Sequence, residues 1–261
     1  MHPVLIKVGP LAIHTYGVLV AAGFLAGIFL AMREARRKGI DPDRIMDLGL
    51  YILAAAIIGS RLMQVAIEYR YYLAHPLEIF MIWRGGLVFY GGFIMAAAVA
   101  IWYLRRHSLP VWMVGDILAP SIALGHSIGR LGCFSAGCCY GKPADLPWAV
   151  TFTDPECLAI TGVPLHPSQL YESAASFAFF LFLYAYRKRT TFVGQLFWIY
   201  VLGYSVIRFM LEFLRGDVQR GFTELAGFHV STSQAIGLAI FITSVVMLSR
   251  LKSASRKKRK V

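Results

Sequence analysis

Long apolar runs dominate the chain, and short polar or charged segments separate them. Spanning the hydrocarbon of a bilayer takes about 20 mostly apolar residues in an α-helix. The runs are continuously apolar, without the strict alternation of barrel strands, which favours helices. We therefore predict an all-α polytopic membrane protein with about seven transmembrane helices, near residues 11–32, 45–67, 88–104, 112–129, 173–186, 193–213 and 230–249.

The composition places the whole chain in the membrane class. Of its 261 residues, 57% are hydrophobic and 15% are charged. The mean hydropathy of +0.61 exceeds that of an ordinary soluble domain. Because we find no internal repeat and no region that would fold in water, we expect a single integral membrane domain over residues 1–261. The first apolar run is long enough to span the bilayer, so we expect a retained anchor rather than a cleaved signal peptide.

Basic residues are distributed unevenly between the segments that separate the apolar runs, and this predicts the topology. Most of the 26 Lys and Arg residues follow the first, third, fifth and seventh runs. We expect the N-terminus outside, the C-terminus in the cytoplasm and a basic cytoplasmic tail at 250–261. Attraction to anionic membrane lipids explains the net charge of +12 better than nucleic acid does, because the basic clusters lie beside the spans. We therefore expect no nucleic-acid partner.

The longest connection, about 132–170, lies on the predicted outer side, and we call it the outer loop. A loop of this length is often functional. Its cysteines lack the pairing and the histidines of a zinc site, and the outer side has no carboxylate cluster suited to magnesium or calcium, so we expect no metal and no other cofactor. A disulfide between Cys157 and Cys138 or Cys139 is one interpretation. The other interpretation is that the cysteines are small buried residues that allow helices to pack. The outer loop contains all four cysteines of the chain, Cys133, Cys138, Cys139 and Cys157.

Arg130 stands inside the glycine-rich segment 125–141, at the end of the fourth apolar run. A guanidinium near the bilayer needs an anion, a carboxylate or water as its partner. Five glycines in this segment leave the backbone uncovered, so a bulky headgroup can approach closely and amide N–H groups can point at it. We interpret the segment as a site for a lipid phosphate.

Two further polar segments begin predicted spans. His14 and Tyr16 open the first span, where a tyrosine by itself is more typical of an interfacial anchor than of a functional group. Arg84, Tyr90 and Gly91 belong to a segment with four glycines, which is dense for ordinary helix packing. Function and structure are equally good interpretations of this second segment.

Two more polar segments accompany the fifth and sixth spans. His166 and Gln169 lead into the fifth span, where His166 or Ser168 has the alternative role of capping the helix. Arg208 and Glu212 are four residues apart, on one face of the sixth span. A structural ion pair is the alternative for these two, and it is compatible with a functional role.

These segments resemble the motifs of one family. Gly129-Arg-Leu-Gly-Cys-Phe-Ser-Ala-Gly-Cys-Cys-Tyr-Gly141 looks like the signature of the bacterial prolipoprotein diacylglyceryl transferases. The His-x-Tyr-Gly, Gly-Gly-x-x-x-Tyr-Gly-Gly, His-Pro-Ser-Gln-Leu-Tyr-Glu and Arg-Phe-x-x-Glu-Phe-x-Arg segments occur in the order of that family, from about Pro10 to about Gln234. The seven-helix, N-out topology of the family agrees with the one predicted above from charge.

The resemblance implies a reaction in the bacterial inner membrane. A diacylglyceryl group passes from phosphatidylglycerol to the lipobox cysteine thiol of a prolipoprotein, which forms a thioether and releases glycerol phosphate. The implied partners are phosphatidylglycerol, prolipoprotein signal peptides and membrane lipids, at an active site towards the outer side. We take Arg208, Glu212, Tyr90 and His14 as catalytic candidates, and Arg130, Tyr16, Arg84, Gly91, His166 and Gln169 as substrate-binding candidates.

Three positions depart from the family pattern. Many members have Asn where Cys133 stands, Glu where Cys138 stands and His where Tyr90 stands. A mechanism that needs that glutamate does not apply here unchanged, although Glu172 and Glu212 are alternative carboxylates. The tyrosine is a smaller change, because a phenol still donates a hydrogen bond to phosphate.

The chemistry fits these residue types. A thiol of pKa near 8.5 is only a few per cent ionised at neutral pH, so the acceptor needs a base or a positive field. The leaving phosphate gains negative charge, which Arg130 and Arg208 are suited to hold.

The identity of the base stays open. Tyr90, His14, His126 and His166 are the candidates in declining order, and His126, four residues before Arg130, is equally suited to orienting that arginine. A family relative with another acceptor or no activity, and a membrane transporter, are the alternative functions.

Overall fold

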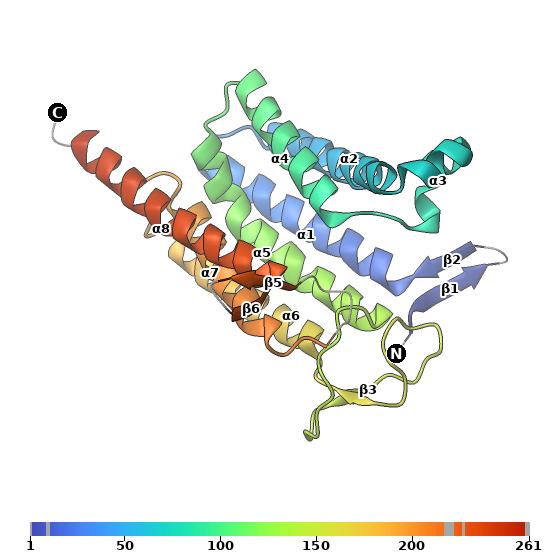
Figure 1. Ribbon diagram of the computed structural model, residues 1–261. Helices are drawn as coiled ribbons and strands as arrows, with labels where there is room; N and C mark the ends of the chain where they lie inside the picture. The colour runs from blue at the N-terminus through green and yellow to red at the C-terminus, as the bar shows by residue number, and fades with distance from the viewer. Residues whose placement is uncertain (1, 9–10, 217–221, 226–227, 259–261) are drawn as a thin grey trace. The chain divides into compact units, whose positions relative to one another are not determined.

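The computed structural model describes residues 2–8, 11–216, 222–225 and 228–258. A helix occupies most of each range predicted from the apolar runs (Figure 1). These helices are α1 Thr15–Arg37, α2 Pro42–Ile67, α4 Phe89–Arg106, α5 Val111–Ala136, α6 Ser168–Tyr186, α7 Gln195–Glu212 and α8 Thr232–Lys258. Three short helices that the sequence did not predict follow α2, namely α3 Tyr69–Ala74, η1 Pro76–Phe80 and η2 Ile82–Arg84.

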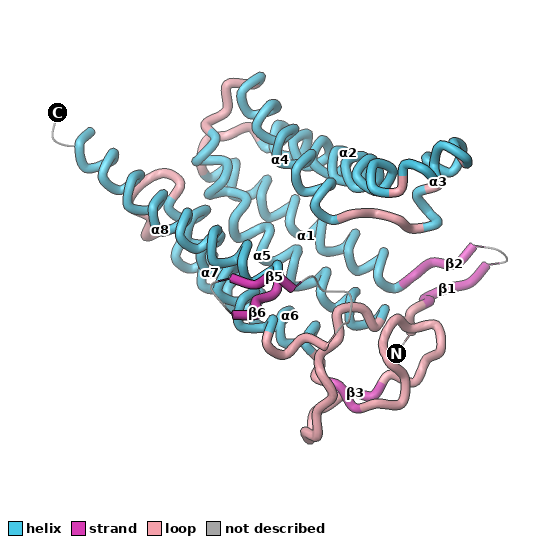
Figure 2. Tube along the Cα trace, in the orientation of Figure 1, coloured by secondary structure: helices cyan, strands magenta, loops and turns pink. Residues whose placement is uncertain are grey.

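Short antiparallel hairpins accompany the helices, and they shift two predicted boundaries (Figure 2). The first predicted span begins too early, because residues 11–14 pair as a strand and the helix begins at Thr15. The last predicted span also begins too early, because the strand runs to Ser231. The hairpins are β1 Val4–Val8 with β2 Leu11–His14, β3 Val150–Thr151 with β4 Pro164–Leu165, and β5 Phe222–Leu225 with β6 Phe228–Ser231.

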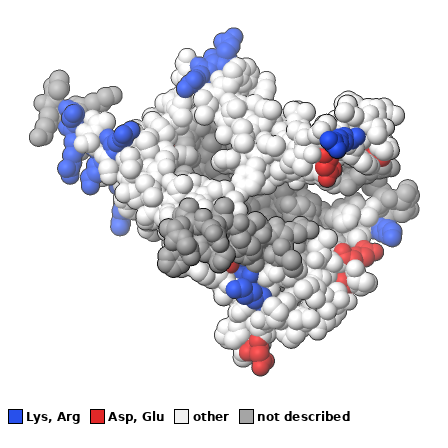
Figure 3. All heavy atoms as spheres, in the orientation of Figure 1, with Lys and Arg blue, Asp and Glu red and all other residues white. Residues whose placement is uncertain are grey.

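The protein is a helical membrane protein. Within the described residues, four helices are long and apolar enough to cross a bilayer, Thr15–Arg37, Pro42–Ile67, Val111–Ala136 and Thr232–Lys257. The helices α4, α6 and α7 have 18, 19 and 18 residues, close to the lower limit for a span. Seven spans therefore remain a prediction. Exposed basic side chains gather at the C-terminal end of α8 (Figure 3).

The chain forms two compact units. The first unit comprises the chain up to Ala31 together with the chain from Gly115 onward, and the second runs from Met32 to Val114. In the second unit α2 and α4 lie side by side (Figure 1). A Cβ added at Gly59 would lie 2.5 Å from the carbonyl oxygen of Gly91, and one at Gly92 would lie 2.7 Å from that of Ala56. Missing side chains thus allow the two backbones to approach closely.

Arg61 of α2 organises the connection that follows in the second unit. Its Nε donates to the carbonyl of Ile79 at 2.9 Å, and its Nη1 donates to that of Gly85 at 2.8 Å. Its Nη2 donates to the carbonyl of Glu78, and the guanidinium lies 5.2 Å from the ring centroid of Tyr72. A buried arginine near the end of a candidate span is therefore satisfied by backbone carbonyls.

In the first unit α5 packs against α1, α6 and α7. A Cβ at Gly23 of α1 would lie 2.7 Å from the carbonyl oxygen of Gly125. Ala119, Ala123, Leu183 and Leu196 form a fully buried apolar cluster of α5, α6 and α7. This packing fixes the helices that carry the charged groups described below.

The buried Asp116 of α5 holds the beginning of α7. Its carboxylate accepts the backbone N–H of Gly194 at 2.8 Å and that of Phe197 at 2.9 Å. The first N–H groups of a helix have no partner within the helix, and a carboxylate there also complements the helix dipole. A side chain of one helix thus caps another.

The outer loop folds on a small core of its own. Phe152, Ala159 and Leu165 are buried, and Phe134 and Val150 pack against them. Gly141 donates its N–H to the carbonyl of His166 at 3.0 Å, which joins the two ends of the loop. All four cysteines are free thiols, so the structure contains no disulfide between Cys157 and Cys138 or Cys139.

Candidate functional site

A buried charged network joins α5 and α6 in the first unit. Glu172 of α6 has a side chain only 5% exposed. Its Oε1 lies 2.8 Å from Arg130 Nη2 and 3.0 Å from His126 Nε2. Because His126 and Arg130 are four residues apart on α5, one carboxylate reaches both. The arginine predicted to bind phosphate therefore already has a carboxylate partner within the membrane region.

The predicted pair on α7 is present. Arg208 Nη2 lies 3.0 Å from Glu212 Oε2, and it donates to Ser233 Oγ of α8 at 3.4 Å. Glu212 is buried, with 2% of its side chain exposed. The ion pair expected from the i, i+4 spacing is confirmed, and its geometry is compatible with both a structural and a functional role.

Tyr204 and Glu172 connect the two arginines. Both residues interact electrostatically with Arg130 and with Arg208. The ring of Tyr204 stands edge-on to His126, with centroids 5.1 Å apart. The structure thus brings the arginines of α5 and α7 to one site.

Each of these two arginines retains a buried donor. Arg130 Nε and Arg208 Nη1 are buried and have no hydrogen-bond partner among the described residues. A buried donor without a partner costs about 1–3 kcal/mol, more for a charged group. Two such donors at one site are what an anion with several acceptor oxygens, such as a phosphodiester, would satisfy.

The C-terminal end of α5 and the turn after it add thiols to the site, and Tyr16 of α1 lies beside them. Cys133 Sγ lies 3.8 Å from Arg130 Nη1, and the Cys138 thiol donates to the carbonyl of Cys133 at 3.7 Å. Hydrogen bonds with the Cys133 and Cys139 thiols, together with burial, raise the pKa of the Cys138 thiol. Tyr16 interacts electrostatically with Arg130. It also packs on Gly132, where an added Cβ would lie 3.3 Å from the tyrosine ring. The Cys138 thiol donates a hydrogen bond here, whereas a carboxylate would only accept one.

The segment at the beginning of α6 makes hydrogen bonds that support the backbone of the turn at Cys138 and Cys139. Gln169 Nε2 donates to the carbonyl of Cys138 at 2.8 Å, and Ser168 Oγ donates to that of Cys139 at 2.8 Å. These bonds hold a turn in which Cys139 has a φ of +59°, a conformation that non-glycine residues rarely adopt. His166 contributes its carbonyl to Gly141 and places its ring near Tyr171. A role of His166 or Gln169 in binding substrate stays a prediction.

Four other candidates lie away from this network or in the second unit. His14 is exposed on β2, opposite Val4. In the second unit, Tyr90 is 47% exposed on the first turn of α4, and Gly91 packs against α2. Packing accounts for the missing side chain at Gly91, and substrate binding there stays a prediction. The side chain of Arg84 lies outside the described part of the structure.

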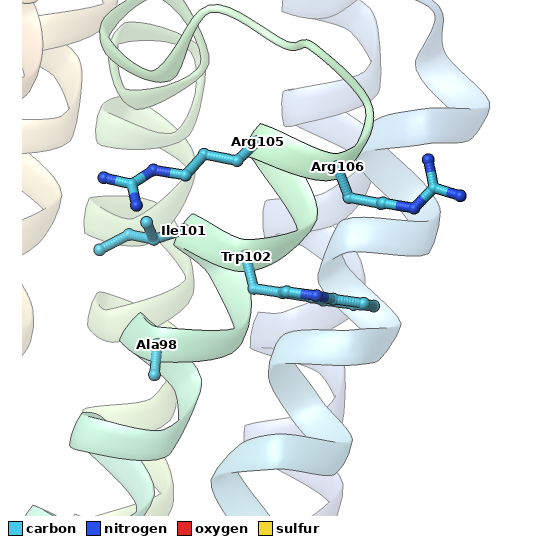
Figure 4. Close-up of a pocket in the computed structure, with 5 residues that line it drawn as sticks. All are labelled: Ala98, Ile101, Trp102, Arg105 and Arg106. Atoms are coloured by element: carbon cyan, nitrogen blue, oxygen red, sulfur yellow. The ribbon is translucent and has the colours of Figure 1, made fainter.

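A hollow of about 450 Å³ lies beside the last turns of α4, in the second unit. It is lined by Ala98, Ile101, Trp102, Arg105 and Arg106 (Figure 4). Ile101 and Arg105 point to one side of the helix and Trp102 and Arg106 to the other. Side chains that diverge in this way do not converge on a ligand, and none of the predicted site residues contributes to the hollow.

Sequence reasoning gave too little weight to three residues. Glu172 appeared only as an alternative carboxylate, His126 ranked third among candidate bases, and Tyr204 was not selected. The i, i+4 spacing of His126 and Arg130 pointed to a shared face. Their common partner lies 46 residues beyond His126, and local spacing carries no signal for such a contact.

Two partly buried arginines, each paired with a buried carboxylate on apolar helices, define the class as a helical membrane protein with a charged site among its helices. Residues 3–250 match the family described as Prolipoprotein diacylglyceryl transferase. The chain belongs to this family, as its motifs indicated.

Curated relatives support the same assignment, and each is named phosphatidylglycerol–prolipoprotein diacylglyceryl transferase. The protein from Synechococcus elongatus is 40% identical over 223 residues, covering 82% of this chain and 77% of the relative. The Bacillus velezensis protein is 33% identical over 252 residues, covering 95% and 91%. The Clostridium tetani protein is 34% identical over 249 residues, covering 95% and 97%. The similarity thus extends over nearly the whole chain.

Proposed function

We propose that the protein transfers the diacylglyceryl group of phosphatidylglycerol to the lipobox cysteine thiol of prolipoproteins. The observation that carries the proposal is the pair of buried, unpartnered donors on Arg130 and Arg208. Both belong to guanidinium groups whose Nη2 atoms pair with Glu172 and Glu212. The arginines are thus oriented, with donors left for a phosphate.

The arginines act on the leaving group. Attack of the thiol sulfur on the glyceryl carbon breaks the carbon–oxygen bond, and the glycerol phosphate leaves with the bonding electrons. Its phosphate changes from a diester to a monoester and gains negative charge. Donors aimed at a charge that develops in the transition state contribute about 2.7–4 kcal/mol each in a dry site. Arg130 and Arg208 supply this stabilisation without a cofactor.

The remaining candidates complete the proposal. Tyr16 borders the phosphate site through Gly132 and Arg130. Tyr90, Gly91 and Arg84 of the second unit, together with His14, are proposed contacts for the lipid or the prolipoprotein. His166 and Gln169 shape the turn at Cys138.

The site works within one integral membrane domain over residues 1–261. We place this domain in the bacterial inner membrane, with seven spans, the N-terminus outside and the active site towards the outer side. Membrane lipids and prolipoprotein signal peptides would approach the site laterally, because both substrates are themselves held in the bilayer.

A transfer assay with two labels tests the proposal. The purified protein is incubated with a lipobox peptide and phosphatidylglycerol labelled either in an acyl chain or in the headgroup glycerol. We expect the acyl label on the peptide and the headgroup label in released glycerol phosphate. The peptide with serine in place of cysteine is the matched control and should stay unlabelled.

The same assay separates the alternatives. A relative that uses another acceptor would consume phosphatidylglycerol without labelling the cysteine peptide. A transporter, reconstituted in vesicles, would move labelled substrate across the bilayer without any covalent product. Either result, obtained with folded protein, would refute the proposed transfer.

A further inference from the structure

The imidazole of His126 is hydrogen-bonded through its Nε2 atom. Its Nε2 lies 3.0 Å from Oε1 of Glu172, the same oxygen that Arg130 approaches at 2.8 Å. A carboxylate paired with a guanidinium is ionised and can only accept a hydrogen bond. Nε2 therefore carries the hydrogen, which leaves the lone pair of the neutral ring on Nδ1.

The free side of the ring is accessible. Nδ1 has no hydrogen-bond partner within residues 2–8, 11–216, 222–225 and 228–258. The side chain of His126 is 25% exposed, whereas that of Glu172 is 5% exposed. Nε2 is thus engaged by a buried carboxylate, while the partly exposed side chain leaves Nδ1 without a partner among those residues.

Charged and titratable groups surround the ring from three helices. Glu172 of α6 faces Nε2, and the ring of Tyr204 of α7 stands edge-on with its centroid 5.1 Å away. Arg130 lies one turn further along α5 and pairs with the same carboxylate. Arg208 of α7 acts on the carboxylate of Glu172. The carboxylate of Glu172, paired with Arg130, faces Nε2 and complements the positive charge that the ring gains when Nδ1 takes up a proton.

We propose that His126 is the general base that removes the proton of the acceptor thiol, and that Glu172 is its positioning residue. This inference rests on the proposed transfer reaction. The S–H proton passes to Nδ1 as the sulfur forms its bond to the glyceryl carbon, and the phosphate oxygen departs with the electron pair. The imidazolium then releases its proton to solvent.

The geometry decides between catalysis and simple support of Arg130. An imidazole that only oriented Arg130 would contact it, yet the hydrogen bond of His126 goes to Glu172 and not to the guanidinium. Glu172 makes its own ion pair with Arg130 without help from the ring. A positioned base of suitable pKa contributes about 10²–10⁴-fold to a rate.

A lipobox peptide with selenocysteine in place of cysteine tests whether His126 acts as the base. A selenol ionises well below neutral pH, so a peptide with selenocysteine in the lipobox needs no base, while its transfer still needs the phosphate site. For His126→Gln we expect transfer to the cysteine peptide to fall by about 10²–10⁴-fold, and transfer to the selenocysteine peptide to stay within roughly tenfold of the unmodified protein. Arg130→Ala is the matched control, and it should lose both activities alike.

The pH dependence of the unmodified protein gives a second measurement that does not depend on a folded variant. With the cysteine peptide, kcat/KM should rise with pH and level off before the thiol range near 8.5. With the selenocysteine peptide the rise should move to lower pH.

Two results would overturn the role of His126. One is an equal loss of transfer to the cysteine and selenocysteine peptides in folded His126→Gln protein. The other is a kcat/KM that rises continuously with pH up to the thiol range. Absence of any transfer by the unmodified protein would instead refute the proposed function. The two failures are therefore distinguishable.

Discussion

At the scale of single residues, Arg130 is held by Glu172 and retains the buried Nε donor. We expect Arg130→Ala to lower the transfer rate by about 10²–10³-fold. Arg130→Lys should recover little, because lysine keeps the charge but loses the planar fork. The measurement is the initial rate with labelled phosphatidylglycerol in detergent, with the exposed Arg189→Ala as the control that keeps normal activity. A near-normal rate for Arg130→Ala would remove this residue from the site.

Arg208 and Glu212 should act as one unit, because they form a 3.0 Å ion pair with the carboxylate buried. Removing either partner leaves the other charge uncompensated. Each single alanine variant should therefore lose nearly as much activity as the double variant. Mild losses that add up in the double variant would show that the pair contributes only to the fold.

The thiols where many relatives have Asn and Glu should be dispensable. Cys138 donates to a backbone carbonyl, and its pKa is raised by hydrogen bonds with neighbouring thiols. A serine hydroxyl can make the same donation. We expect Cys138→Ser and Cys133→Ser, separately, to keep transfer within about threefold of the unmodified protein. Inactive Cys138→Ser protein that still folds and binds phosphatidylglycerol would make the thiol catalytic.

The sequence predicted a contact within one helix but not the contacts between helices. Arg208 and Glu212 were paired correctly because a helix brings positions four apart onto one face. The meeting of His126 and Arg130 with Glu172 depends on how α5 and α6 pack, which apolar periodicity does not specify. Tyr204 was missed for the same reason, since its significance comes from neighbours on other helices.

At the scale of elements, the glycines of α4 can be tested as packing residues. A Cβ at Gly91 would overlap Met63 and the carbonyl of Gly59. Overpacking of this kind typically costs about 1–3 kcal/mol. We therefore expect Gly91→Ala to lower the Tm of the purified protein. Gly17→Ala is the matched control, because nothing lies within 4 Å of a Cβ there. Equal Tm values for the two variants would contradict the packing role.

The helices were predictable, and the hairpins were not. A run of about 20 apolar residues has one stable form in a bilayer, so composition alone predicts the helix. The strands are four or five residues long in β1, β2, β5 and β6. Short apolar strands next to apolar helices carry no distinguishing period, which explains why two predicted spans begin inside a strand.

At the scale of the whole molecule, the predicted topology has a direct test. A fluorescent protein fused after the C-terminus should fold in the cytoplasm and fluoresce, because the exposed basic end of α8 is expected to remain inside. Alkaline phosphatase inserted in the outer loop after Asp154 should be active, because it folds only outside the cytoplasm. A C-terminal fusion that does not fluoresce, together with an inactive phosphatase in the outer loop, would contradict the predicted topology.

The carbonyl acceptors of Arg61 have a consequence for how the protein is made. They lie 17 to 25 residues further along the chain. At about 5–20 residues per second, the ribosome needs about 1–5 seconds to supply them after Arg61 itself. During that interval α2 enters the translocon with a charge that has no final partner. We expect α2 to complete its partition into lipid together with the following segment, so that the helical hairpin of α2 and α4, rather than the single helix, is the unit of insertion.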